Sequence, residues 1–145
     1  MSEDGKFLRV PGTNPFFTGD DALQGNRFYD LLKSSPETKV YLLNTGRVGG
    51  LEKNTLSKKV HIRDSAYCLE GIIQGTISWK KDDDFGYYTA EKITGIDDEL
   101  IHPKHLYHRQ RRESEYTQIV KRFQDERRKY LNRFIGLHEH IKQSM

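Results

Sequence analysis

The stretch from Lys39 to Gly50 constrains the fold of this chain more than any other part of the sequence. It reads KVYLLNTGRVGG, so the apolar run Val40–Leu43 gives way abruptly to polar residues and glycines. A short apolar run bounded by glycine predicts a buried strand that leads into a tight loop. Loops at strand ends often carry the ligand sites of α/β proteins, but an ordinary tight exit from a strand gives the same pattern.

The composition limits the chain to one domain with a modest core. It has 145 residues, of which 34% are hydrophobic and 31% charged, and its formal net charge is +3. That charge is too balanced to indicate a membrane or a nucleic acid as partner, and neither is expected. Cys68 is the only cysteine, which favours a reducing compartment. With no secretory signal pattern and no apolar run near the ~20 residues of a membrane span, the sequence predicts a soluble cytoplasmic protein.

Periodicity and turn signals predict a mixed α/β (α+β) fold, with a small mixed sheet flanked by helices and a long C-terminal helix. The expected domain runs over residues 14–136, after an irregular lead-in at 1–13 and before a frayed tail at 137–145. The expected elements begin with a helix capped by Asn26 and ending near Ser34, and with strands at Val40–Leu43 and Lys58–Ile62. A helix capped by Asp64 or Ser65 and stopped by Gly75 should follow, and then either a hairpin or two strand fragments at Ile77–Lys80 and Tyr87–Thr89. The last expected elements are a segment over Glu91–Tyr107 that is mostly loop and a helix over Arg112–Gly136.

Several motifs have a functional and a structural interpretation. The lysines Lys58-Lys59 beside a helix N-terminus could hold an anion or nucleotide, or could be a solvated strand edge. The run Asp82–Asp84 lacks the spacing of a calcium loop, so we expect a solvated turn. The chain contains no phosphate-binding P-loop motif. The histidines His102, His105 and His108 are spaced by three, but Pro103 between them disfavours a zinc site.

Five segments, taken in order, resemble the C-terminal end of ATP-dependent phosphoenolpyruvate carboxykinase. VYLLNTGRVGG is similar to that family's Y-L-V-N-T-G-W-x-G-G, and SKKVHIRDSAYCLEGIIQGTI to its G-K-R-I-x-I-x-D-T-R-A-I-[IV]-x-A-[IL]-x-x-G-x-L. The stretch IHPKHLY resembles its L-x-P-[RK]-x-x-[YW]. The five resembling segments are Asn14–Leu32, Val40–Gly50, Ser57–Ile77, Ile101–Tyr107 and Glu115–Phe134.

The resemblance implies part of an enzyme of gluconeogenesis, a lyase that converts oxaloacetate and ATP into phosphoenolpyruvate and carbon dioxide with the help of divalent metal. In the family, the phosphate loop, the metal ligands and the oxaloacetate-binding arginines lie upstream of the matched region. The resemblance therefore implies a fragment that does not catalyse this reaction alone, and that uses metal only through an upstream part. Its expected partner is an upstream carboxykinase-like domain, or a second copy of itself.

The resemblance also implies where a nucleotide would bind. Lys59 stands at the family's adenine-site arginine, Val60 and Ile62 at its apolar neighbours, and Ser65 at a threonine near the base. These four residues are the expected nucleotide-binding set, with ATP as the ligand; no catalytic and no metal-binding residue is expected. Arg47 replaces a family tryptophan, a departure that also fits an alternative, a non-catalytic interaction module that kept the fold and lost nucleotide binding.

Overall fold

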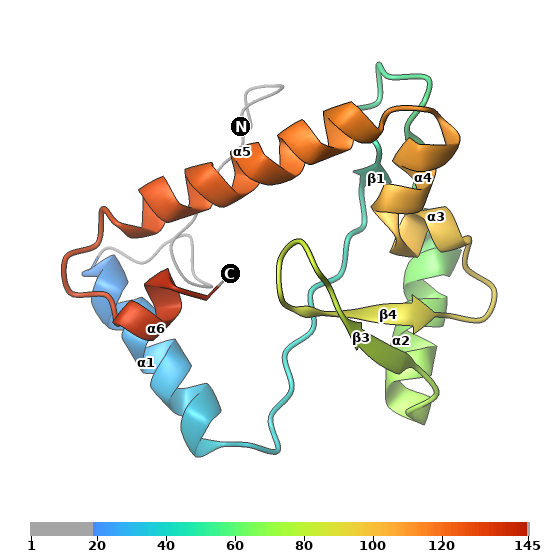
Figure 1. Cartoon of the computed structure of the whole chain (residues 1–145). Coiled ribbons are helices and arrows are strands. Elements are labelled where there is room, and N and C mark those ends of the chain that lie inside the picture. Colours follow the sequence, from blue (N-terminus) through green and yellow to red (C-terminus); the bar gives the residue numbers. More distant parts are fainter. Residues whose placement is uncertain (1–18, 145) are drawn as a thin grey trace. The chain divides into compact units, whose positions relative to one another are not determined.

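The structure, a computed structural model, describes residues 19–144, and these form two compact units. One unit comprises residues 19–40 and 125–144 of the described chain, and the other comprises residues 41–124. The mixed α/β class expected from the sequence is confirmed, with its strands in two separate two-stranded antiparallel sheets (Figure 1). The lead-in at 1–13 and the start of the first resembling segment lie outside the described residues.

In the first unit, helix α1 runs over Asp21–Ser34 and begins six residues earlier than the sequence predicted. The prediction that Asn26 caps this helix is wrong, because the cap is Asp20. The Asp20 carboxylate accepts hydrogen bonds from the backbone N–H groups of Ala22 and Leu23, at 2.8 and 3.3 Å. These are the free N–H groups that an N-cap satisfies. The predicted end at Ser34 is confirmed.

Asn26 instead holds the end of the chain against α1. Its side-chain amide donates to the carbonyl of Gly136 at 2.8 Å and accepts from the N–H of His138 at 2.8 Å. Between these two contacts lies Leu137, which is buried. The short helix α6, Glu139–Lys142, follows, so the segment expected to be a frayed tail contains a buried leucine and a helix.

The second unit begins with a small antiparallel ribbon. Strand β1, Arg47–Val48, pairs with β2, Lys58–Lys59, in the register Arg47↔Lys59 and Val48↔Lys58. The predicted strand at Val40–Leu43 is wrong: no strand among the described residues pairs with it, and its side chains are exposed. An apolar run becomes a strand only where a neighbouring strand and a covering layer are available, and residues 19–144 supply neither.

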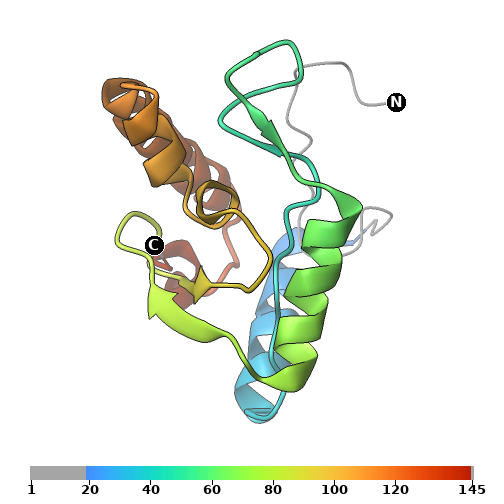
Figure 2. The same cartoon turned by 90° about the vertical axis from the view of Figure 1, so that its right-hand side faces the viewer.

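Helix α2, Ile62–Gln74, follows β2 after two residues (Figure 2). The helix starts before the predicted caps, since His61 is the N-cap and Asp64 lies in the first turn, where its carboxylate accepts a hydrogen bond from the His61 N–H at 2.8 Å. Ile62 is therefore helical rather than the last residue of a strand. The predicted stop at Gly75 is confirmed, and its φ of 65° is a left-handed conformation that suits glycine.

The predicted hairpin is confirmed as β3, Ser78–Lys81, and β4, Tyr88–Lys92. Its turn contains the three aspartates, and the Asp82 carboxylate accepts N–H bonds from residues 84 and 85. One face of the hairpin packs on α2 through the core of the second unit. This core contains Ile77, Ala90 and Ile93, with Cys68, Ile72, Ile96 and Ile101 around them.

The prediction that Glu91–Tyr107 is mostly loop is wrong. This part of the chain forms α3, Asp98–Ile101, and α4, Pro103–Arg109. Pro103 occupies the first turn of α4, where a missing N–H and a fixed φ are tolerated. Leu106 of α4 is fully buried. The last long helix, α5, covers Glu113–Leu131 and ends five residues before the predicted end at Gly136.

No helix in the described part of the chain has the length and apolar character that crossing a bilayer requires.

Candidate functional site

The four residues expected to bind nucleotide lie at one junction, where β2 leads into α2. Lys59 is exposed on β2, and Ile62, the first residue of α2, is 91% exposed. Val60 and Ser65 are half-buried. The Val60 N–H donates to the carbonyl of Gly46 at 2.9 Å, which fixes the junction to the glycine-bearing loop before β1. A cation, two apolar side chains and a hydroxyl thus lie within seven consecutive residues at this junction.

Arg47 joins the two ends of the loop between β1 and β2. Its guanidinium donates from Nε to the Ser57 hydroxyl at 2.8 Å and from NH2 to the Ser57 carbonyl at 3.1 Å. Ser57 is buried, and its hydroxyl, which has one hydrogen to donate, lies 3.0 Å from the carbonyl oxygen of Leu51 and 2.7 Å from that of Asn54. The residue that departs from the family pattern thus ties β1 to the segment that enters β2, a contact that sequence spacing alone did not indicate.

The glycines of the loop allow a close approach to α4. Gly49 has a φ of 86°, and a Cβ placed on it would lie 2.7 Å from Cδ2 of the buried Leu106. Its carbonyl accepts a hydrogen bond from NH2 of Arg112 at 3.2 Å, and the Arg112 guanidinium lies 4.5 Å from the centre of the Tyr107 ring. Packing against Leu106 of α4 therefore explains the glycine at position 49, whereas a Cβ on Gly50 would lie 2.6 Å from the side-chain nitrogen of Asn54.

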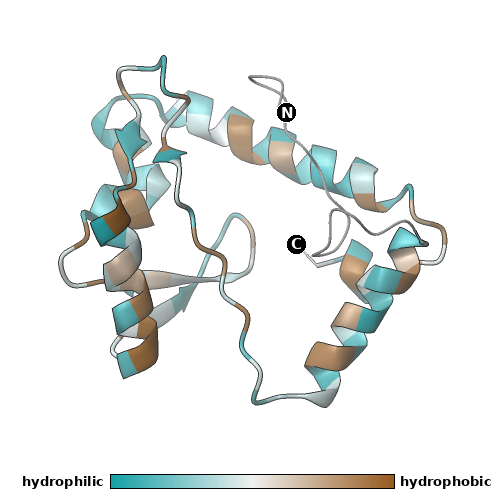
Figure 3. Ribbon diagram, turned by 180° about the vertical axis from the view of Figure 1, so that it is seen from behind, coloured by the Kyte–Doolittle hydropathy of each residue, from teal (hydrophilic) through white to brown (hydrophobic). Residues whose placement is uncertain are grey.

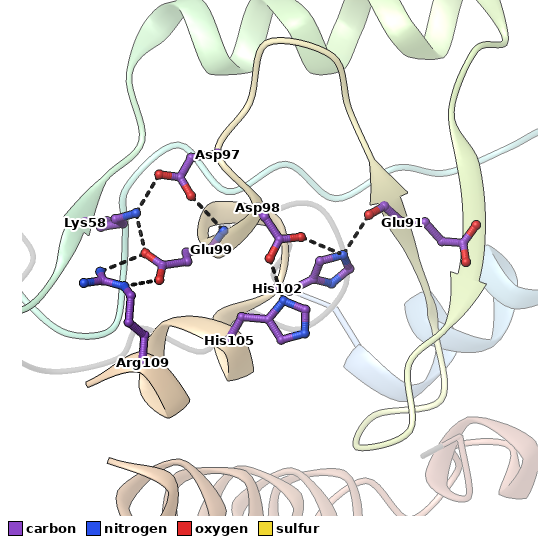
Figure 4. Close-up of polar contacts among 8 residues, drawn as sticks. All are labelled: Lys58, Glu91, Asp97, Asp98, Glu99, His102, His105 and Arg109. Carbon is purple, nitrogen blue, oxygen red and sulfur yellow. Dashed lines mark hydrogen bonds and ion pairs between the residues drawn. The ribbon is translucent and has the colours of Figure 1, made fainter. Parts of the chain in front are cut away.

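An ionic network holds β2 to α3 and α4 (Figure 4). Lys58 contacts Asp97, with 2.6 Å between Nζ and Oδ2, and also Glu99; Glu99 accepts from Arg109 as well. The hydrogen bond from Arg109 is the main cause that lowers the pKa of Glu99 from 4.5 to about 2, and the hydrogen bond from Lys58 lowers the pKa of Asp97. Sequence reasoning missed this network.

Beside the network, two of the three evenly spaced histidines share one carboxylate. His105 Nδ1 lies 2.5 Å from Oδ2 of Asp98, and His102 Nε2 lies 3.8 Å from Oδ1 of the same residue and 2.9 Å from the carbonyl oxygen of Glu91. His108 instead faces Glu113. Over residues 19–144 no group of three or more histidine, cysteine or acidic side chains is placed to hold a metal ion.

Comparison with known proteins agrees with the resemblance noted in the sequence. The family model for phosphoenolpyruvate carboxykinase matches residues 11–99. The chain is also similar to the phosphoenolpyruvate carboxykinase (ATP) of Novosphingobium aromaticivorans, with 23% identity over 134 residues. That alignment covers 90% of this chain but 24% of the relative, so the chain spans about a quarter of the length of the curated relative it matches.

Proposed function

This chain belongs to the phosphoenolpyruvate carboxykinase (ATP) family, and on that premise we propose that it forms one wall of a nucleotide pocket, on the side of the base and ribose. The observation that carries the proposal is the position of the expected set. The β2–α2 junction lies inside the matched region, and Lys59 and Ile62 present their side chains to solvent there.

Each residue of the set has a role in this proposal. Lys59 supplies a cation at the edge of the site, and Val60 and Ile62 supply apolar surface on which a base can rest. Ser65 supplies a hydroxyl that can donate or accept a hydrogen bond. The lysine keeps the positive charge of an arginine but lacks its planar guanidinium, so we expect it to bind the base more weakly than an arginine would.

The whole reaction, which converts oxaloacetate and ATP into phosphoenolpyruvate and carbon dioxide, is proposed only for a larger assembly that includes this chain. The proposed partner is a carboxykinase-like domain that carries the phosphate-binding part of the site.

A titration of the chain with ATP tests the proposed function. Calorimetry should detect saturable binding at millimolar nucleotide or below, and Ser65→Ala together with Ile62→Ala should weaken it. Leu51→Ala together with Thr55→Ala is a matched control, because it removes an exposed apolar side chain and a hydroxyl from the neighbouring loop. The absence of binding at millimolar ATP would leave only the family relationship.

A second candidate function, a non-catalytic interaction module, is favoured by the apolar surface of the second unit. The extended segment Val40–Leu43 is the brown stretch in the coil between α1 and β1 in Figure 3. Leu42 is 95% exposed, and Ile62 and Ile73 on α2 are 91% and 83% exposed. Exposed apolar side chains in this number are typical of a surface that another protein covers.

Sedimentation of the chain at several concentrations tests this second candidate. Self-association that is abolished by Leu42→Ser and Ile73→Ser would support an interaction surface. A monomer at all concentrations, which also fails to bind a separately produced carboxykinase-like domain, would contradict it.

A further inference from the structure

The β1–β2 ribbon carries a pair of like charges, Arg47 and Lys59, of which the proposed base-side wall uses only Lys59. Arg47 and Lys59 are directly opposite each other in the antiparallel register. Opposite residues of such a pair present their side chains on the same face of the ribbon. Like charges in that arrangement destabilise a sheet unless an anion lies between or beside them.

On the other face of the same ribbon, the positive charge is neutralised by carboxylates. There Val48, which is buried, lies opposite Lys58, and the Lys58 ammonium contacts the carboxylates of Asp97 and Glu99. Adjacent lysines on β2 thus differ completely in their surroundings. One is paired with two carboxylates, and the other faces solvent (Figure 4 shows the Lys58 side).

Neither cation of the Arg47–Lys59 pair has a carboxylate partner among the residues that the structure describes. Arg47 donates only to the uncharged Ser57, from Nε and NH2, and Lys59 makes no ion pair in residues 19–144. The bonds to Ser57 fix the plane of the guanidinium and leave its remaining N–H donors for another acceptor. Over residues 19–144, therefore, one cation is held by Ser57, the other is exposed, and neither is paired with a carboxylate.

We propose that Arg47 and Lys59 together bind an oxyanion of the phosphate class on the exposed face of the β1–β2 ribbon. A planar guanidinium matches the geometry of phosphate oxygens, and a lysine ammonium adds a second charge-assisted contact. The inference deepens the proposed function, on which it rests for the source of that phosphate, a nucleotide. It changes the expected ligand preference of this wall from the base toward the phosphate.

Calorimetric titration of the full chain with pyrophosphate and with adenosine, in buffer without magnesium, tests the inference. The expected result is saturable pyrophosphate binding that weakens as salt is added. Lys59→Glu should weaken it by about fivefold or more, the change expected for losing one ~1 kcal/mol charge contact. The Lys59 side chain makes no described hydrogen bond or ion pair, so this variant should keep its circular dichroism spectrum. Arg47→Lys keeps the charge but loses the planar guanidinium and its two bonds to Ser57, so it should weaken the binding as well.

The double variant Lys80→Ala with Lys92→Ala is the matched control, because it removes two exposed positive charges from the β3–β4 sheet of the same unit. The inference would be overturned if Lys59→Glu weakened pyrophosphate binding no more than the control variant does. Adenosine binding without pyrophosphate binding would overturn it as well and leave the proposed function standing. Pyrophosphate binding without adenosine binding would support the inference and contradict the base-side pocket.

Discussion

Replacing Glu99 with glutamine removes the carboxylate that Lys58 and Arg109 share, and with it the charge that holds β2 to α4. The Glu99 side chain is 13% exposed, and its pKa is lowered from 4.5 to about 2. A change of that size corresponds to at most ~3 kcal/mol of unfolding free energy. The Arg109 side chain is 60% exposed, so water screens this partner, and we expect a loss of about 1 kcal/mol.

The loss should depend on pH in a definite direction. Because folding lowers the pKa of Glu99, its stabilisation is fully present above the ordinary value of 4.5 and is lost as the pH falls toward about 2. The difference between the native chain and Glu99→Gln should therefore be full at pH 7 and clearly smaller at pH 3. At pH 7 the substitution Glu99→Gln should lower the melting temperature by about 5 °C.

Urea unfolding followed by the fluorescence of Trp79 is the assay, since this is the only tryptophan and lies on β3 of the second unit. Glu52→Gln is the control, because Glu52 is an exposed carboxylate of the same unit for which no ion pair is described. Equal losses for the two variants, or a loss for Glu99→Gln that does not change with pH, would refute the reasoning.

Two further predictions concern packing in the second unit. Gly49→Ala should lower the unfolding free energy by about 2–3 kcal/mol, because its φ is 86° and the new Cβ would lie 2.7 Å from Leu106. Gly75→Ala, with a φ of 65° and open space, should cost about 1 kcal/mol, so equal losses in urea unfolding would contradict the packing argument. Burial raises the pKa of the Cys68 thiol, so iodoacetamide at pH 8 should alkylate the folded chain far more slowly than the chain in urea; equal rates would contradict it.

Local signals in the sequence were sufficient for some elements of the fold. The hairpin followed from β-branched and aromatic residues on either side of an aspartate-glycine turn, and the stop at Gly75 followed from its place after an apolar helical stripe. The two helices after the hairpin, α3 and α4, were predicted to be loop, and Pro103 was taken to disrupt helical geometry. In the first turn of a helix, proline instead favours the start.

The remaining features depend on residues far apart in the sequence. Lys58 and Asp97 are separated by 39 positions, and Asn26 and Gly136 by 110, so no local pattern could pair them. The run Val40–Leu43 has the composition of a strand, but strand formation requires a partner that residues 19–144 do not provide. The expected nucleotide-binding set came from the family resemblance, and its function is still a prediction.

The measurement that tests the central proposal most directly is an ATP titration of the isotope-labelled chain, followed by the chemical shift of each backbone amide. The proposal predicts saturable changes that centre on the β2–α2 junction, at Lys59, Val60, Ile62 and Ser65. Amides of α1, in the other unit, serve as the internal control and should not change. No change at millimolar ATP, or changes confined to segments away from the junction, would contradict the account.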